Sequence, residues 1–270
     1  MPASDGLPPI VDEAALDALD NVLLADVRWY LDGADGHAAF IAGHRPGAAW
    51  VDLDRWLASA PTAADGRHPF PTPEVFGDGM RSIGLSDGQP LVAYDDRQGV
   101  PASRLVWMLR LLGHPASLLD ATWPPEHLES GDATTAPGDF STRPWPTDRL
   151  VDADRVSAEA ASGDVVIDAR AAERYRGDTE PIDRRAGHIP GAINLPFEGN
   201  LAAGRFRSAD ELAARFAEVG DAPIVYCGSG VSACHNLLAM ESIGVRARLY
   251  PGSWSQWSAD PSRDTASGET

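Results

Sequence analysis

Short apolar runs alternate with longer amphipathic stretches along most of the chain. The runs that read as strands are residues 22–25, 48–53, 91–94, 117–119, 165–167, 192–195, 224–226 and 247–250. Runs this short and this apolar are typical of buried parallel strands. Helical periodicity marks residues 105–112 and 233–243. The alternation of strands and helices predicts an α/β fold with a mainly parallel sheet.

This pattern occurs twice, at a domain-sized period. The matching segments, in chain order, are NVLLADVR (21–28) with DVVIDAR (164–170), GHRPGA (43–48) with GHIPGA (187–192), and PLVAYD (90–95) with PIVYC (223–227). Residues 99–123 then align with residues 230–254 without a gap. Three matches in the same order indicate a duplicated domain.

The repeat also places the domain boundaries. We expect an N-terminal domain at residues 1–123 and a C-terminal domain at residues 151–257. Residues 124–150 are rich in Pro, Gly, Ser, Thr and Asp and are predicted to be a surface linker. Residues 258–270 have the composition of a flexible tail.

The charge of the chain narrows the function classes. It holds 40 acidic and 22 basic residues, a net charge of −18, which opposes binding to nucleic acids and to anionic lipid surfaces. No apolar run approaches the roughly 20 residues of a membrane helix. The first residues lack the basic and apolar regions of a signal peptide. We therefore expect a cytoplasmic protein without a membrane segment, in which the two cysteines are reduced thiols.

The loop that begins at Cys227 is the strongest candidate for chemistry. Cys227 directly follows a predicted strand, and a glycine-rich turn with Gly228 and Gly230 leads into a helix near Ala233. Such a turn gathers backbone N–H groups at a helix N-terminus, which favours a thiolate nucleophile. A buried structural thiol is the alternative for any cysteine. The strand–loop–helix setting favours catalysis for Cys227, whereas Cys234 is predicted to be a core residue, with a resolving thiol as the lesser alternative.

The GHxPGA segments, the duplicated halves and the loop CGSGVSA at 227–233 resemble the tandem rhodanese-type sulfurtransferases. The resemblance extends over residues 21–257 and implies two tandem rhodanese-like domains, each a mainly parallel sheet flanked by helices. The loop is most similar to CGSGVT of the 3-mercaptopyruvate sulfurtransferases, and Ser232 keeps the hydroxyl of that threonine. A non-catalytic rhodanese-like binding module is the distant alternative.

The resemblance implies a mechanism. Cys227 would take a sulfane sulfur from a small donor, become a persulfide, and pass the sulfur to cyanide, a small thiol or a thioredoxin-like protein. No cofactor and no metal is implied. The loop residues Gly228, Gly230, Val231 and Ser232 would line the substrate. Because residues 227–233 carry no charged side chain, the loop favours monoanionic mercaptopyruvate over dianionic thiosulfate. Thiosulfate:cyanide transfer through the same Cys227 persulfide is the alternative.

Arginine is the natural clamp for a carboxylate, because its guanidinium group offers two parallel donors. By resemblance, Arg174 matches the first substrate-binding arginine of the mercaptopyruvate enzymes. Arg184 is our choice for the second, although the spacing there is shorter than in the family. Arg176 and Arg185 are predicted to be surface residues.

The family also implies a Ser–His–Asp relay around the first serine of the loop, Ser229. We expect the matching histidine to be His44 of the first GHxPGA segment, with Asp35 as an orienting acid. A structural role, in which His44 bonds only to backbone, is equally consistent, since His188 occupies the same place in the second half.

The first half lacks the nucleophile. The counterpart of Cys227 there is Asp95 or Asp96, and neither can carry sulfane sulfur, so the N-terminal domain is predicted to be inactive in transfer. A cysteine-dependent phosphatase is disfavoured for the second half as well. Those enzymes use Cys-x5-Arg, and Ala233 stands at the arginine position.

Overall fold

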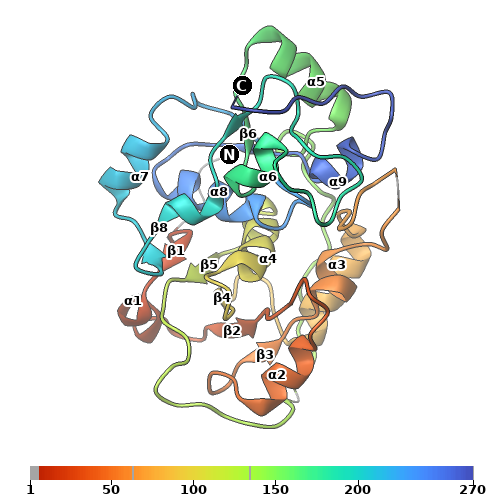
Figure 1. Cartoon of the computed structure of the whole chain (residues 1–270). Helices are drawn as coiled ribbons and strands as arrows, with labels where there is room; N and C mark the ends of the chain where they lie inside the picture. Colours follow the sequence, from red (N-terminus) through yellow and green to blue (C-terminus); the bar gives the residue numbers. More distant parts are fainter. Residues whose placement is uncertain (1–5, 63, 134, 270) are drawn as a thin grey trace. The chain divides into compact units, whose positions relative to one another are not determined.

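The chain divides into two compact units. The computed structural model describes residues 6–62, 64–133 and 135–269. One unit comprises Met1–Ser59 and Pro71–Trp145, and the other comprises Ala60–Phe70 and Pro146–Thr270 (Figure 1). A short segment of the first half therefore belongs to the second unit, which the repeat pattern did not predict. None of the helices in the described ranges is both long and apolar enough to cross a membrane.

The first unit is built on a five-stranded parallel sheet in the order β1-β5-β4-β2-β3. Its strands are β1 Ile10–Val11, β2 Leu23–Asp26, β3 Ala49–Trp50, β4 Leu91–Tyr94 and β5 Ala116–Leu119. Its helices are α1 Glu13–Asp17, α2 Gly36–Ala42, the π-helix η1 Leu53–Leu57, α3 Pro73–Ser82 and α4 Val100–Leu111. Helix α4 packs against β4 and β5 (Figure 1).

The second unit repeats this plan with a four-stranded parallel sheet in the order β11-β10-β6-β7. Its strands are β6 Val166–Asp168, β7 Ile193–Asn194, β10 Ile224–Tyr226 and β11 Arg248–Leu249, with an antiparallel pair β8 Leu201–Ala202 and β9 Arg205–Phe206. Its helices are α5 Ala153–Ser162, α6 Ala172–Arg176, η2 Phe197–Asn200, α7 Ala209–Arg215, α8 Ala233–Ser242 and α9 Ser253–Trp257. Leu150 forms a parallel bridge with Leu249 at the edge of this sheet. This bridge is equivalent to the pairing of β1 with β5 in the first unit.

The sequence pattern located the central strands closely. Strands β4 and β10 have the predicted bounds. The predicted strand at 48–53 is shorter, because Asp52 accepts the backbone N–H of Arg55 at 3.1 Å and starts a helical turn there. Helix α4 begins earlier than its periodicity indicated, since Gly99, with φ of 85°, turns the chain directly into it.

Two segments predicted to be irregular are bound to the units. In the segment predicted to be a flexible tail, Ala266 forms a backbone bridge with His188, with both N–H groups donating. In the predicted linker, Glu129 pairs in the same way with His44, and Phe140 is buried. Composition did not reveal these contacts, because backbone pairing does not depend on side-chain type.

The duplication extends to buried ion pairs at the strand ends. In the second unit Arg170 donates to both carboxylate oxygens of Asp168 and, at 2.6 Å, to the carbonyl oxygen of Gly187. The same contacts are made in the first unit by Arg28, Asp26 and Gly43. The repeated Asp-x-Arg motif is thus structural in both halves.

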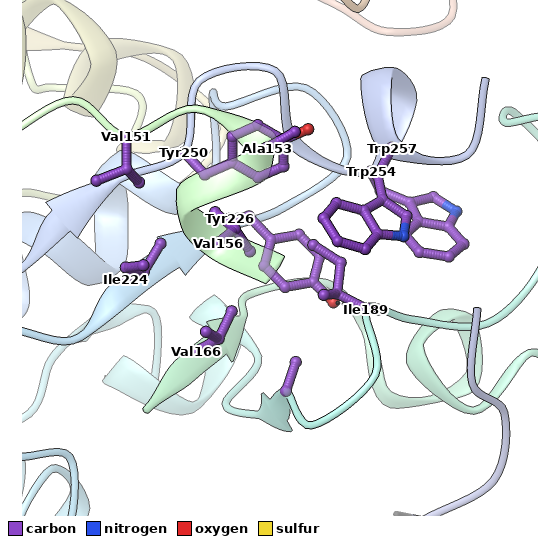
Figure 2. Close-up of a cluster of buried hydrophobic side chains, with 11 residues drawn as sticks. Val151, Ala153, Val156, Val166, Ile189, Ile224, Tyr226, Tyr250, Trp254 and Trp257 are labelled. Carbon is purple, nitrogen blue, oxygen red and sulfur yellow. Dashed lines mark hydrogen bonds between the residues drawn. The ribbon is translucent and has the colours of Figure 1, made fainter. Parts of the chain in front are cut away.

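An aromatic cluster fills the core of the second unit. The largest members of the cluster are Tyr226, Tyr250, Trp254 and Trp257. Figure 2 shows them packed with aliphatic side chains from α5, β6 and β10. Trp254 donates its backbone N–H to the carbonyl oxygen of Cys227 at 2.9 Å. Burial of this cluster therefore also fixes the backbone at the carboxyl end of β10.

Candidate functional site

Cys227 is the first residue after β10, and its side chain is almost completely buried. Its backbone N–H donates to Oγ of Ser253 at 3.2 Å. The loop then turns back, and the N–H of Gly230, at φ of 78°, donates to Sγ of Cys227 at 3.1 Å. Gly230 permits this turn because a positive φ is accessible to glycine at little cost. A donor aimed at the sulfur suits a thiolate or an anionic persulfide.

Helix α8 follows the loop, so its N-terminal dipole faces the thiol. Ser232 is half-buried at the helix start, and Val231 is buried. Cys234 lies in the first turn and donates its S–H to the carbonyl oxygen of Gly230 at 3.3 Å. Cys234 is thereby a buried residue that holds the loop, as predicted for a core position.

Ser229 has an imidazole partner that the sequence reasoning missed. Its Oγ lies 2.7 Å from Nδ1 of His68, and both side chains are buried. His68 belongs to the segment Ala60–Phe70, which is part of the second unit. The backbone N–H of the neighbouring Arg67 donates to Oγ of Ser255 at 3.1 Å, which anchors this segment beside the loop.

His44, which we expected at this position, is held within its own unit. Its Nδ1 lies 2.9 Å from the carbonyl oxygen of Phe40, and the two rings stack at 3.8 Å. His188 makes the same pair of contacts with Tyr175, at 2.8 Å and 3.7 Å. The two GHxPGA histidines therefore share a structural role, and the hydrogen bond to Ser229 comes from His68.

One sequence signal could have identified His68. The stretch GRHPFP (66–71) that contains it matches GRFRSA (204–209) of the second half, where Phe206 stands at the position of the histidine, whereas His44 is repeated as His188. A residue repeated in both halves serves what both halves share, namely the fold. The proposed orienting acid, Asp35, instead caps helix α2 by accepting the N–H of Ala38 at 3.0 Å.

Two guanidinium groups lie against the loop at the residue after the nucleophile. A methyl group placed on Gly228 would lie 2.8 Å from Nη2 of Arg67 and 3.6 Å from Nη1 of Arg174. A side chain here would move the end of Arg67, so glycine leaves room for that guanidinium group beside the loop. The Nε–H groups of Arg67 and Arg174 are buried and have no hydrogen-bond partner in the described part of the chain.

Two acidic side chains hold these arginines. Nη2 of Arg174 donates to Oε1 of Glu180 at 2.6 Å and to Oδ2 of Asp183 at 3.2 Å. Nη1 of Arg67 donates to Oδ1 of Asp183. Burial raises the pKa of Asp183. Burial acts in the same direction on Glu180, but the contacts with Arg174 and the backbone N–H groups of Asp183 and Ile182 together outweigh that effect and lower its pKa.

The other predicted arginines lie elsewhere. Arg184 is exposed and makes no hydrogen bond or ion pair with any described residue. Arg185 was predicted to be a surface residue, but it donates to the carbonyl oxygens of Ser258 and Arg263, among others, and holds the C-terminal segment. Arg176 pairs with Asp178 near the surface.

In the first unit a carboxylate occupies the position of the thiol. Asp95 is the first residue after β4, and its oxygens accept the backbone N–H groups of Arg97, Gly99 and Ala102 at 2.7, 2.8 and 2.9 Å. Burial raises the pKa of Asp95 to about 6. The anion-binding turn of the first unit is therefore filled by a side chain of its own loop.

No group of three or more His, Cys, Asp or Glu side chains is arranged to hold a metal ion within residues 6–62, 64–133 and 135–269. The side chains gathered at the loop of the second unit are instead a thiol, a hydroxyl, an imidazole and two guanidinium groups. This set suits nucleophilic attack on an anionic substrate.

Comparison with known proteins places this arrangement in a family. The rhodanese-like domain family matches residues 152–260. The chain is 39% identical over 268 residues to a protein of Mycobacterium tuberculosis that is provisionally named thiosulfate sulfurtransferase SseB, covering 94% of this chain and 93% of that protein. It is 40% identical over 267 residues to a Pseudomonas aeruginosa protein that is provisionally named 3-mercaptopyruvate sulfurtransferase, covering 92% and 93%.

The fold agrees with these matches. The crystal structure of SseA from Escherichia coli, described as a 3-mercaptopyruvate sulfotransferase with the rhodanese fold, superposes with a TM-score of 0.78 at 29% identity, covering 92% of this chain and 99% of that one. Because relatives this similar extend through both units, the chain belongs to the rhodanese family, as a sulfurtransferase built from two rhodanese-like domains.

Proposed function

We propose that this sulfurtransferase takes its sulfur from 3-mercaptopyruvate and carries it as a persulfide on Cys227. The observation that supports this donor is the pair of guanidinium groups, Arg67 and Arg174, beside the residue that follows the thiol. Two arginines suit a carboxylate, which accepts parallel N–H bonds. The buried Nε–H groups of both arginines provide donors that no protein group uses among the described residues.

The proposed first step needs only the thiol and the donor. The thiolate of Cys227 attacks the sulfur of mercaptopyruvate, an S–S bond forms, and the C–S bond breaks. Its electron pair remains on carbon as the enolate of pyruvate, and the proton of the donor thiol ends on that carbon. Attack by cyanide on the outer sulfur then releases thiocyanate and restores the thiolate.

Ser229 and His68 are proposed to act on the carbonyl group of the donor. The charge that develops in the first step collects on the enolate oxygen, where a hydroxyl donor stabilises it. The hydrogen bond between Ser229 and His68 orients that hydroxyl and provides a group that can exchange its proton.

Replacement of His68 should therefore slow transfer from mercaptopyruvate. For His68→Gln we expect kcat to fall about 100-fold, which is the usual contribution of a positioned acid–base group. His44→Gln, assayed on protein shown to be folded, should retain near wild-type kcat, because His44 bonds to Phe40 instead. Steady-state rates of thiocyanate formation measure both variants. A large loss of kcat in His44→Gln with none in His68→Gln would show that His44, as expected from the sequence, is the partner of Ser229.

Thiosulfate is the second candidate donor, and one observation favours it. The loop residues are uncharged, as the sequence indicates, but Arg67 and Arg174 place guanidinium N–H groups beside the loop from other segments. These N–H donors would also hold the oxygens of thiosulfate. The absence of charge within residues 227–233 therefore does not by itself distinguish the two donors.

The deciding measurement compares kcat/KM for transfer to cyanide from the two donors. We expect mercaptopyruvate to be preferred by about tenfold or more. Arg174→Gln should raise KM for mercaptopyruvate by about 10- to 100-fold, the effect of losing a hydrogen bond to a charged group. The exposed Arg184→Gln is the matched control and should change KM less than twofold. A preference for thiosulfate would overturn the donor assignment and leave the family intact.

The physiological acceptor and the location are further proposals. A thioredoxin-like protein is a suitable acceptor, because its thiols can take the outer sulfur from the Cys227 persulfide and release it as sulfide. The cytoplasmic location inferred from the sequence remains a prediction, as does the absence of nucleic-acid binding inferred from the net charge of −18.

A further inference from the structure

Asp183 stands where an anionic donor would bind. Its carboxylate lies between Arg67 and Arg174, the two arginines that contact the loop beside the thiol. The side chain is only 5% exposed. Both of its oxygens are held by the ends of guanidinium groups, which is the environment that an incoming carboxylate requires.

The charges of this cluster are balanced. Three guanidinium groups face three carboxylates. Arg67 pairs with Asp183. Arg170 pairs with Asp168 and Glu180. Arg174 pairs with Glu180 and Asp183. A balanced cluster offers no net positive charge to a ligand. An anionic ligand can pair fully with the arginines only if it displaces one of the three carboxylates.

Asp183 is the carboxylate that a ligand can displace, because it is held by the fewest contacts. Asp168 is bound through both oxygens to Arg170. Glu180 also accepts the backbone N–H groups of Ile182 and Asp183, at 3.1 and 3.0 Å, and is thereby tied to the main chain. Within the described residues, the carboxylate of Asp183 accepts hydrogen bonds only from the terminal Nη groups of Arg67 and Arg174. Burial raises the pKa of Asp183, so this carboxylate is also the less stable anion of the two that hold Arg174.

Building on the donor assignment above, we propose that Asp183 determines donor specificity, by occupying the anion position between Arg67 and Arg174 so that donors with one negative charge are selected over donors with two. A monoanion replaces Asp183 one for one, and the charge around the arginines is unchanged. A dianion brings a second negative charge next to the displaced carboxylate and the thiolate, and like charges brought together oppose binding.

Asp183→Asn tests this role. The amide has nearly the same shape and can still accept a hydrogen bond from an arginine, but the cluster gains one net positive charge. Both donors should bind more tightly, and the dianion should gain more. We expect the ratio of kcat/KM for thiosulfate to kcat/KM for mercaptopyruvate to rise about 10- to 100-fold over wild type, measured with cyanide at constant ionic strength.

Two variants of the full chain serve as controls. Asp178→Asn removes the same charge a few residues away, where the side chain is exposed and paired with Arg176 at 2.8 Å. Its ratio should change less than twofold. Asp183→Glu keeps the charge and should keep the wild-type ratio. An unchanged ratio in Asp183→Asn, or an equal shift in Asp178→Asn, would overturn the proposal.

The outcome can be separated from that of the donor assignment. If wild type prefers thiosulfate, the donor assignment fails, while the shift between wild type and Asp183→Asn still decides the role of Asp183. Binding without turnover gives a second readout, because pyruvate as a monoanion and sulfate as a dianion should each slow alkylation of Cys227. We expect Asp183→Asn to improve protection by sulfate more than protection by pyruvate, and equal or smaller improvement would contradict the proposal.

Discussion

Cys227→Ser is expected to lower sulfur transfer by at least about 10³-fold with either donor. A serine hydroxyl is a poor nucleophile toward sulfur and cannot hold a sulfane sulfur, so the covalent intermediate is lost. The substitution is nearly isosteric, the backbone contacts of this residue are kept, and the serine oxygen can accept the N–H of Gly230 that Sγ accepts in the wild type. The variant should therefore fold like the wild type, which circular dichroism and thermal unfolding would check.

A mass measurement makes this prediction specific. After incubation with donor and no acceptor, the wild-type chain should gain the mass of one sulfur atom at Cys227, and Cys227→Ser should gain none. Cys234→Ser is the matched control, because Cys234 is also a buried free thiol but points its S–H to a backbone carbonyl. It should keep the added sulfur and most of the activity. Transfer at the wild-type rate by Cys227→Ser would refute the proposed mechanism.

Arg170→Met is expected to destabilise the second unit by about 3–5 kcal/mol. The guanidinium group of Arg170 is buried and donates to both oxygens of Asp168 and to the carbonyl oxygen of Gly187. Without it, a carboxylate remains buried and unpaired at the end of β6. Urea unfolding, combined with amide hydrogen exchange of β6 and β10, measures the loss and assigns it to this unit.

A second substitution separates the charge from the packing. Asp168→Leu combined with Arg170→Met removes both partners and should recover a large part of the lost free energy, because no charge is then left unpaired. Arg28→Met should destabilise the first unit by a similar amount, since Arg28 makes the equivalent contacts with Asp26 and Gly43. A loss below about 1 kcal/mol in Arg170→Met would show that this pair is solvated and not structural.

Most of the fold could be predicted from the sequence because its signals are local and occur twice. A buried parallel strand must be a short apolar run, so β4 and β10 were located with the correct bounds. The repeated Asp-x-Arg and GHxPGA segments marked the duplication, and their contacts proved to be the same in both units. The thiol loop was visible for the same reason, since a strand, a glycine turn and a helix start follow one another in the chain.

The partners of that loop were decided by the tertiary structure. His68 and Ser229 are 161 positions apart, and no periodicity or motif within either segment links them. Arg67 is also distant from Gly228 in the sequence but lies beside it in the fold. Arg184, which was chosen by its place in the sequence, is exposed. The sequence by itself therefore determined the duplicated α/β fold and the nucleophile, since both depend on neighbours along the chain. Only packing decided which imidazole, guanidinium and carboxylate groups surround the nucleophile, because such contacts depend on which distant segments the fold brings together.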